Sequence, residues 1–252
     1  MTNSLLRVAL GLTLALAVSV QAAEVRVMAG SAIAPALNEI ARQFERKTGH
    51  TLVIDYGIFQ VLKNKIEAGE AFDLAIIGEG SMDDATRLGR VLPDTRTFVA
   101  RVGMAVAVKA GAPKPDIGSV EAFKRMLLSA KSIAYPPKGA IGIHLGKVFG
   151  TLGISEQMSS KIRALQTVEL VPHAVSSGDA ELGFAPTTVL IAGSDIDIVG
   201  PLPAELQSYI VYVSAVGTSA KEPDAARAFI QHLAMPDAVS VMKVKGFEVG
   251  IR

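Results

Sequence analysis

The sequence has no cysteine and no tryptophan, and aromatic residues make up only 5% of its 252 residues. Without cysteine, the chain can form no disulfide, no thiolate metal site, no cysteine nucleophile and no lipid anchor attached through sulfur. With so few aromatic rings, a stacking platform for sugars or nucleic-acid bases is not expected.

The chain also lacks an excess of charge of either sign, with 25 Lys+Arg against 24 Asp+Glu. Such a balance gives no basic footprint for a phosphate backbone, so we expect no nucleic-acid partner. Half of the residues are hydrophobic, which is enough to bury a core and argues against disorder. At roughly 100–200 residues per domain, the length predicts one large or two small domains.

Several catalytic and metal-binding motifs are missing from the sequence. It contains no G-x-G-x-x-G, no P-loop lysine motif, no G-x-S-x-G elbow and no H-E-x-x-H, and its four histidines have no metal-ligand spacing. We therefore expect a protein that is not an enzyme, with no cofactor and no side chain as a direct metal ligand. An exported enzyme would need a nucleophile or paired acid and base groups, and His144 is the one residue that could be argued for such a site.

The first residues have the pattern of a secretory signal peptide. Arg7 precedes an apolar run, 8–20, and small residues follow at Ala22 and Ala23. A 13-residue run is too short to cross a bilayer core of about 30 Å as a helix. We predict that residues 1–23 are a signal peptide cleaved after Ala22 or Ala23, and that the mature protein is free in the periplasm of a two-membrane bacterium.

The mature chain alternates short β-type runs with amphipathic stretches, which indicates an α/β fold. On the first predicted helix, Leu37, Ile40, Ala41 and Phe44 share one face, and Gly49 ends it. Strands are expected at 25–28, 52–56, 72–77, 103–108, 133–135, 182–184, 196–199 and 209–216, with 168–171 continuing the alternation. Helices are expected up to about residue 47 and at 61–68, 82–88, 119–129, 142–152, 173–177, 223–234 and 236–245.

One local pattern recurs along the chain: a strand end, then small or hydroxyl-bearing residues, then a helix start. It occurs at 29–32, 57–60, 139–142 and 186–188. In open α/β sheets the ligand crevice lies beyond the carboxyl ends of the strands, and helix N-termini there can hold an anion without lysine or arginine. The alternative interpretation is that Ser31 and Thr187 are ordinary N-caps.

The stretches 27–50 (VMAGSAIAPALNEIARQFERKTGH) and 65–77 (KIEAGEAFDLAII) resemble the opening of the periplasmic molybdate-binding proteins of ABC importers. The resemblance continues to the terminal Gly246-Phe247. It implies a type II periplasmic binding protein: two α/β lobes with a ligand cleft between them. The implied crossings lie near 101–103 and 211–213, giving lobe 1 as 24–102 plus 213–252 and lobe 2 as 103–212.

The resemblance also implies a ligand site for an oxyanion. Its first serine corresponds to Ser31. Two positions that contribute mainly backbone N–H groups correspond to Ile141, with Gly142 in the same turn, and to Val168. His144, one turn further along the helix, is a possible ligand contact. A backbone donor is retained whatever the side chain is, so these contacts survive the differences in sequence.

Two hydroxyl donors of that site are replaced in this sequence. Their positions correspond to Phe59 and Pro186, neither of which can donate, and Gln60 and either Thr187 or Thr188 are possible substitutes nearby. Each charge-assisted hydrogen bond contributes roughly 1.5–3 kcal/mol, so losing two would weaken oxyanion binding about 10²–10⁴-fold.

The resemblance implies a monomeric substrate-binding component that delivers a small anion to an ABC permease in the inner membrane. Molybdate or tungstate is the family's ligand. A different oxyanion, a small organic acid, or an exported ligand sensor on the same fold remain as alternatives.

Overall fold

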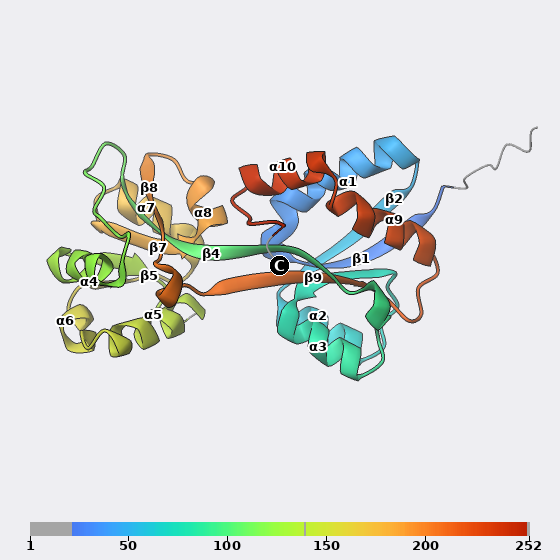
Figure 1. Ribbon diagram of the computed structural model, residues 1–252, viewed down its shortest axis with the longest axis horizontal. Coiled ribbons are helices and arrows are strands. Elements are labelled where there is room, and N and C mark those ends of the chain that lie inside the picture. Colours follow the sequence, from blue (N-terminus) through green and yellow to red (C-terminus); the bar gives the residue numbers. More distant parts are fainter. Residues whose placement is uncertain (1–21, 139, 251–252) are drawn as a thin grey trace, which may run out of the picture.

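Two long strands, β4 (Thr97–Lys109) and β9 (Tyr209–Val216), run between two α/β lobes (Figure 1). The structure is a computed structural model and describes residues 22–138 and 140–250. The two strands pair antiparallel with each other over 97–103 and 209–214. The predicted α/β fold with two lobes is confirmed. The expected lobe boundaries, at 102/103 and 212/213, fall at this ribbon and stay a prediction.

The sheet of the first lobe has the order β2-β1-β3-β9-β4. Strand β1 (Glu24–Gly30) is parallel to β2 (Thr51–Gly57) and to β3 (Leu74–Gly78), and β9 is antiparallel to its neighbours. Strand β9 lies between β3 and β4 in this sheet, although it comes from near the end of the chain and is far from β3 in sequence.

Helices cover both faces of this first sheet (Figure 1). One face carries α1 (Ala34–Thr48), α9 (Pro223–Leu233) and α10 (Pro236–Val244), and the other carries α2 (Phe59–Glu67) and α3 (Glu79–Arg87). The four apolar residues predicted for one face of α1 are all buried, and Gly49 ends the helix with a positive φ of 77°. The amphipathic pattern thus placed α1 correctly.

A buried carboxylate joins three segments of the first lobe. Asp73, only 3% exposed, accepts hydrogen bonds from the backbone N–H groups of Arg26, Lys221 and Glu222 at 2.6–3.0 Å. Hydrogen bonds to a charged acceptor are among the stronger ones in proteins. This side chain therefore ties the start of β3 to β1 and to the segment that leads into α9.

The second lobe is built around β7 (Leu182–Pro186), which lies between β4 and β5 (Ile133–Tyr135). Strand β5 is parallel to β7 and to β6 (Ile162–Ala164), whereas β8 (Ile196–Pro201) pairs antiparallel with β4. The helices of this lobe are α4 (Val120–Ser129), α5 (Ala140–Thr151), α6 (Ser155–Ser159), α7 (Val171–Ser176) and α8 (Thr187–Ile191).

The structure corrects several expected elements. The segment expected to continue the alternation as a strand, 168–171, forms a 3₁₀ turn (Val168–Leu170) that runs into α7. Strand β4 begins at Thr97, six residues earlier than expected, and α6 and β6 were not expected at all. Two of the three residues of β6 are exposed, so it has little of the hydrophobic pattern that reveals a strand.

No helix among residues 22–138 and 140–250 is long and apolar enough to cross a membrane. Of the predicted signal peptide, only Ala22 and Ala23 fall within the described residues.

Candidate functional site

In both lobes, each parallel strand named below is followed at its carboxyl end by the start of a helix or 3₁₀ turn. Strands β1, β2 and β3 end at Gly30, Gly57 and Gly78, and β5 and β7 end at Tyr135 and Pro186. A helix or 3₁₀ turn begins within a few residues of each of these ends. The first N–H groups of such elements have no partner within the helix, so they are free to face a ligand.

A cavity of about 500 Å³, the interlobe cavity, is lined by residues from both lobes. The first lobe contributes Ser31 and its neighbours in the turn that begins α1, and the second contributes residues of the 3₁₀ turn at 168, α7 and α8. Its lining consists of Ser31, Ala32, Pro35, Glu169, Pro172, His173, Ser176, Thr188, Val189, Ala192, Gly193 and Ser194.

Ser31 has the properties of a ligand contact. It is exposed, and the structure gives its hydroxyl no hydrogen-bond partner among the described residues. The N-cap of its 3₁₀ turn is Gly30, with no side-chain cap. The alternative that Ser31 is an ordinary N-cap is therefore wrong, and its hydroxyl faces the interlobe cavity unpaired.

The ring of Phe59 fills the space between two strand ends. A Cβ atom at Gly30 would lie 2.4 Å from the ring, and one at Gly78 would lie 2.7 Å from it. The ring also packs against Tyr212, with the centroids 5.5 Å apart in an edge-to-face arrangement. Phe59 thus forms an apolar wall over the ends of β1 and β3, where the resemblance implied a hydroxyl donor.

Of the expected substitute donors, Gln60 and Thr187 make hydrogen bonds within the protein, whereas Thr188 lines the interlobe cavity. The side-chain amide of Gln60 is exposed and donates to Asn64 Oδ1 at 2.9 Å. The hydroxyl of Thr187 donates to the carbonyl oxygen of Gly103 at 3.2 Å, and no side chain caps α8. The N-cap interpretation of Thr187 is therefore also wrong, because this hydroxyl ties α8 to the linking strand β4.

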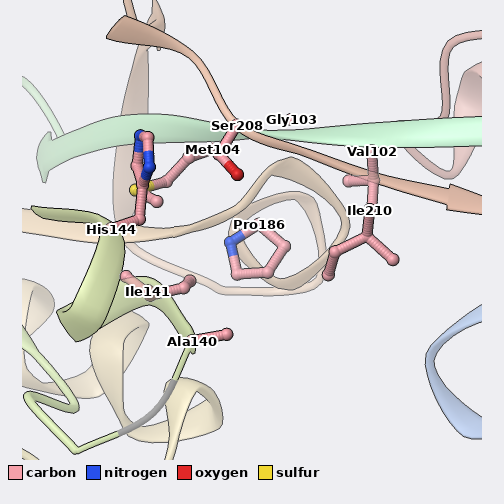
Figure 2. A pocket seen from close by; sticks show the side chains of 9 residues that line it. All are labelled: Val102, Gly103, Met104, Ala140, Ile141, His144, Pro186, Ser208 and Ile210. Carbon is pink, nitrogen blue, oxygen red and sulfur yellow. The ribbon is translucent and has the colours of Figure 1, made fainter. Parts of the chain in front are cut away.

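A second, smaller cavity of about 50 Å³, the hinge cavity, lies where β4 and β9 leave the second lobe. Figure 2 shows Ile141 and His144 of α5 and Pro186 at the end of β7 around it. His144 is half-buried, and its Nε2 lies 2.8 Å from the carbonyl oxygen of Leu206. The full lining is Val102, Gly103, Met104, Ala140, Ile141, His144, Pro186, Ser208 and Ile210.

The remaining expected positions, Gly142 and Val168, line neither cavity, and ligand contacts through their backbones stay a prediction. Gly142 is buried, and a Cβ atom there would lie 2.2 Å from the carbonyl oxygen of Pro137, so the loop before α5 leaves room only for glycine. Val168 is half-buried and packs against the core of the second lobe. Its neighbour Glu169, not Val168 itself, lines the interlobe cavity.

The charges around the two cavities are few. No lysine or arginine is among the described residues that line them, and the ionisable side chains are Glu169, His173 and His144. Across the described ranges, no three His, Asp or Glu side chains are grouped to hold a metal ion. An anion here would depend on helix N-termini and hydroxyl groups, as the recurring turn pattern predicted.

Sequence reasoning missed part of this lining. Glu169, Ser176 and Ser194 were not singled out, and His173 was expected to be an ordinary surface or core residue. Thr188 was predicted as a possible substitute donor after the strand end at Pro186, and it lies in this lining. The others reach the cavity through the packing of α7 and α8, which no local pattern reveals.

Residues 25–248 match the family model described as "Bacterial extracellular solute-binding protein". The chain is 32% identical to the aconitate isomerase of Pseudomonas sp over 88% of this chain and 86% of that protein. It is 30% identical to the molybdate-binding protein ModA of Azotobacter vinelandii over 97% of both. Most relatives are thus named as binding proteins, as expected for a chain that is not an enzyme, but one is named as an enzyme.

The fold has a close counterpart among solved structures. The substrate-binding domain of a putative molybdenum ABC transporter from Clostridium difficile superposes with a TM-score of 0.82, at 20% identity, over 91% of this chain and all of that one. With two lobes, an interlobe cavity and a family match over nearly the whole length, the chain belongs to the bacterial extracellular solute-binding proteins, within the group of the molybdate-binding proteins of ABC importers.

Proposed function

We propose that the chain is a periplasmic solute-binding protein of an ABC importer and that its interlobe cavity takes a small organic anion in preference to molybdate. The observation that carries this choice is the loss of two hydroxyl donors at Phe59 and Pro186. Both residues present apolar surface, and the nearby polar groups of Gln60 and Thr187 are already hydrogen-bonded within the protein.

The chemistry of the cavity wall supports an organic ligand. A tetrahedral oxyanion has no apolar surface and needs a donor for nearly every oxygen, so an apolar wall costs it affinity. An organic acid offers carboxylates to the helix N-termini and to Ser31, and a carbon skeleton to the apolar residues of the lining, Pro35, Pro172 and Val189. The cavity volume of about 500 Å³ lies within the range of about 300–1,000 Å³ that is typical of sites for organic ligands.

A thermal-shift panel on the mature protein tests the ligand class. The probes are molybdate, tungstate, sulfate, phosphate, citrate, cis-aconitate and trans-aconitate, each at the same ionic strength. A ligand at 100 times its Kd stabilises the protein by about 2.7 kcal/mol, which corresponds to a Tm increase of roughly 5–10 °C for a chain of this size.

A shift with a carboxylate and none with molybdate or tungstate is the expected result, and S31A should reduce it. A shift with the metal oxyanions alone would overturn the choice of ligand and restore the family's usual one. The variant S159A, which changes an exposed serine of α6 outside both cavity linings, serves as the control.

A second candidate function, isomerisation of an unsaturated carboxylic acid, is favoured by one specific feature. Glu169 and His173 line the same cavity as Ser31, and a relative of the chain is named as an aconitate isomerase. An isomerisation that removes and returns one proton needs only a positioned acid/base group and no co-reactant. Incubating the protein with cis-aconitate and measuring trans-aconitate by chromatography tests it. Conversion should be lost in E169Q or H173Q, and no conversion by the unmodified protein excludes this function.

The proposed site of action requires export and a membrane partner. We infer that residues 1–23 are removed and that the monomeric mature protein delivers its ligand to an ABC permease. N-terminal sequencing of the protein from a periplasmic extract should begin at Ala23 or Glu24, and a chain that still begins at Met1 would contradict export.

A further inference from the structure

We propose that the hydroxyl of Tyr212 is a specificity-determining hydrogen-bond donor on the first-lobe side of the ligand cleft. This inference rests on the proposed function, because it supplies a donor that the site lacks at Phe59 and Pro186. Nothing in the sequence pattern singles out Tyr212, and it lies outside the positions that the family resemblance implied.

The position of Tyr212 is fixed by its strand. It lies on β9, where it pairs with Gly78 at the end of β3 and with Ala100 on β4. Its ring packs edge-to-face between Phe59 and Phe247, with centroid distances of 5.5 and 5.8 Å. The ring is therefore held rigidly beside the apolar wall that Phe59 forms.

The hydroxyl-bearing end of the ring is directed toward the turn that carries Ser31. A Cβ atom at Gly30 would lie 3.1 Å from Tyr212 Cε1, which is the ring carbon next to the one that bears the oxygen. Gly30 directly precedes Ser31, whose free hydroxyl faces the interlobe cavity. The ring of Tyr212 thus lies against the backbone turn that carries Ser31.

The hydroxyl is nearly buried and has no partner. Tyr212 is 1% exposed, and no hydrogen bond to its oxygen is present among the described residues. A buried polar group without a partner costs about 1–3 kcal/mol, so such groups call for an explanation such as a bound ligand or ion.

The Tyr212 oxygen differs from the fully buried polar atoms that lack a partner. Among the described residues, those side-chain atoms are Gln43 Oε1 and His232 Nε2. We infer that the small exposed part of Tyr212 includes its oxygen. A small molecule entering the cleft could reach it there.

The protonation state of Tyr212 suits a donor. Burial raises the pKa of Tyr212 to about 12, because the phenolate would be poorly solvated. At neutral pH the hydroxyl keeps its proton while a carboxylic acid ligand is ionised. A neutral O–H donor and an anionic acceptor give a charge-assisted hydrogen bond.

Tyr135 provides a matched comparison within the chain. It is also nearly buried, at 3% exposed, and its hydroxyl has no hydrogen-bond partner in the described part of the chain. However, it lies in the second lobe, where its ring packs against Phe149 in the core. Replacing it removes an equivalent hydroxyl without touching the turn at Ser31.

Isothermal titration of the mature protein with cis-aconitate and with molybdate tests the role of Tyr212. We expect Y212F to weaken the binding of the carboxylate about 10- to 100-fold, the value of one charge-assisted hydrogen bond. The ring and its packing are retained in Y212F, so its urea midpoint should equal or exceed that of the unmodified protein. The variant Y135F should bind as the unmodified protein does.

The outcomes are distinguishable. If the unmodified protein binds either probe and Y212F binds it equally well, the hydroxyl is merely a buried group and only this inference is overturned. If Y212F and Y135F weaken binding equally, the effect is general and the inference also fails. If the unmodified protein binds neither probe, the proposed function falls and this inference falls with it.

Discussion

At the scale of single residues, Phe59 explains two glycines that the sequence alone leaves unexplained. Gly30 has φ −60° and ψ 136°, and Gly78 has φ −61° and ψ 144°. Any residue adopts these angles, so the backbone does not require glycine at either position. The ring of Phe59 requires it, because a Cβ atom at either position would overlap the ring.

This relationship predicts a double-mutant cycle between Gly78 and Phe59. G78A should destabilise the protein by about 1–3 kcal/mol, the usual cost of overpacking. In an F59A background the added methyl group has room, so the cost should fall below about 0.5 kcal/mol. Urea denaturation of the four proteins measures the coupling. Additive effects would show that the ring moves aside freely.

At the scale of elements, the packing of α9 on α1 contains a buried histidine. His232 is 7% exposed, packs against Phe44 in a tilted arrangement with centroids 5.4 Å apart, and has no partner for Nε2. Burial, with a smaller contribution from Lys47, lowers the pKa of His232, whereas Asp237 acts in the opposite direction. The contact between these helices therefore favours neutral imidazole.

The lowered pKa of His232 predicts acid sensitivity of this contact. The unfolded chain binds the proton near pH 6.5 and the folded chain only at lower pH, so the free energy of unfolding should decrease as the pH falls below about 6.5. The slope from this residue cannot exceed about 1.4 kcal/mol per pH unit.

Urea midpoints between pH 7.5 and 5 measure this slope, which H232L should reduce. H173Q, which changes an exposed histidine of the second lobe, should leave it unchanged. An identical pH slope in H232L and the unmodified protein would show that other residues cause the acid sensitivity.

Elements with a strong local sequence pattern were predicted correctly, whereas elements with little local pattern were missed. The helix α1 has a buried stripe and a terminal glycine, and its predicted face was correct. The start of β4 (97–102) and the short β6 depend on pairing with distant strands, so their local sequence indicates little. The same limit applies to the site: Ser31 was predicted from its turn, whereas Tyr212 reaches that turn only because β9 lies beside β3.

At the scale of the whole molecule, side-chain contacts stabilise β4 and β9 in the region that would bend if the lobes closed on a ligand. Arg101 of β4 pairs with Glu248 through Nε and Nη2, at 2.9 and 2.8 Å, and its guanidinium lies 3.8 Å from the ring centre of Tyr209. The side chain of Gln207 bonds the backbone N–H and carbonyl of Met104, both at 2.9 Å. Lobe movement should therefore be a rotation of two stiff bodies.

Because the chain contains no cysteine, this movement can be measured with two introduced thiols. Ala32 and Ser194 line the interlobe cavity from opposite lobes, and A32C/S194C can carry spin labels. We expect the distance between the labels to shorten on addition of the ligand identified by thermal shift. The pair A32C/R42C, with both labels on the first lobe, should show no change. An unchanged distance in both pairs would contradict closure.

The position of β9 also has a consequence for how the protein is made. The central strand of the first sheet is synthesised near the end of the chain, so β3 has no antiparallel neighbour until residues 209–216 have emerged. Such non-local pairing slows folding, because distant segments must meet before the sheet gains stability. The first lobe therefore cannot complete its sheet until synthesis is nearly finished, which suits the export proposed above, because a translocation channel passes unfolded chains.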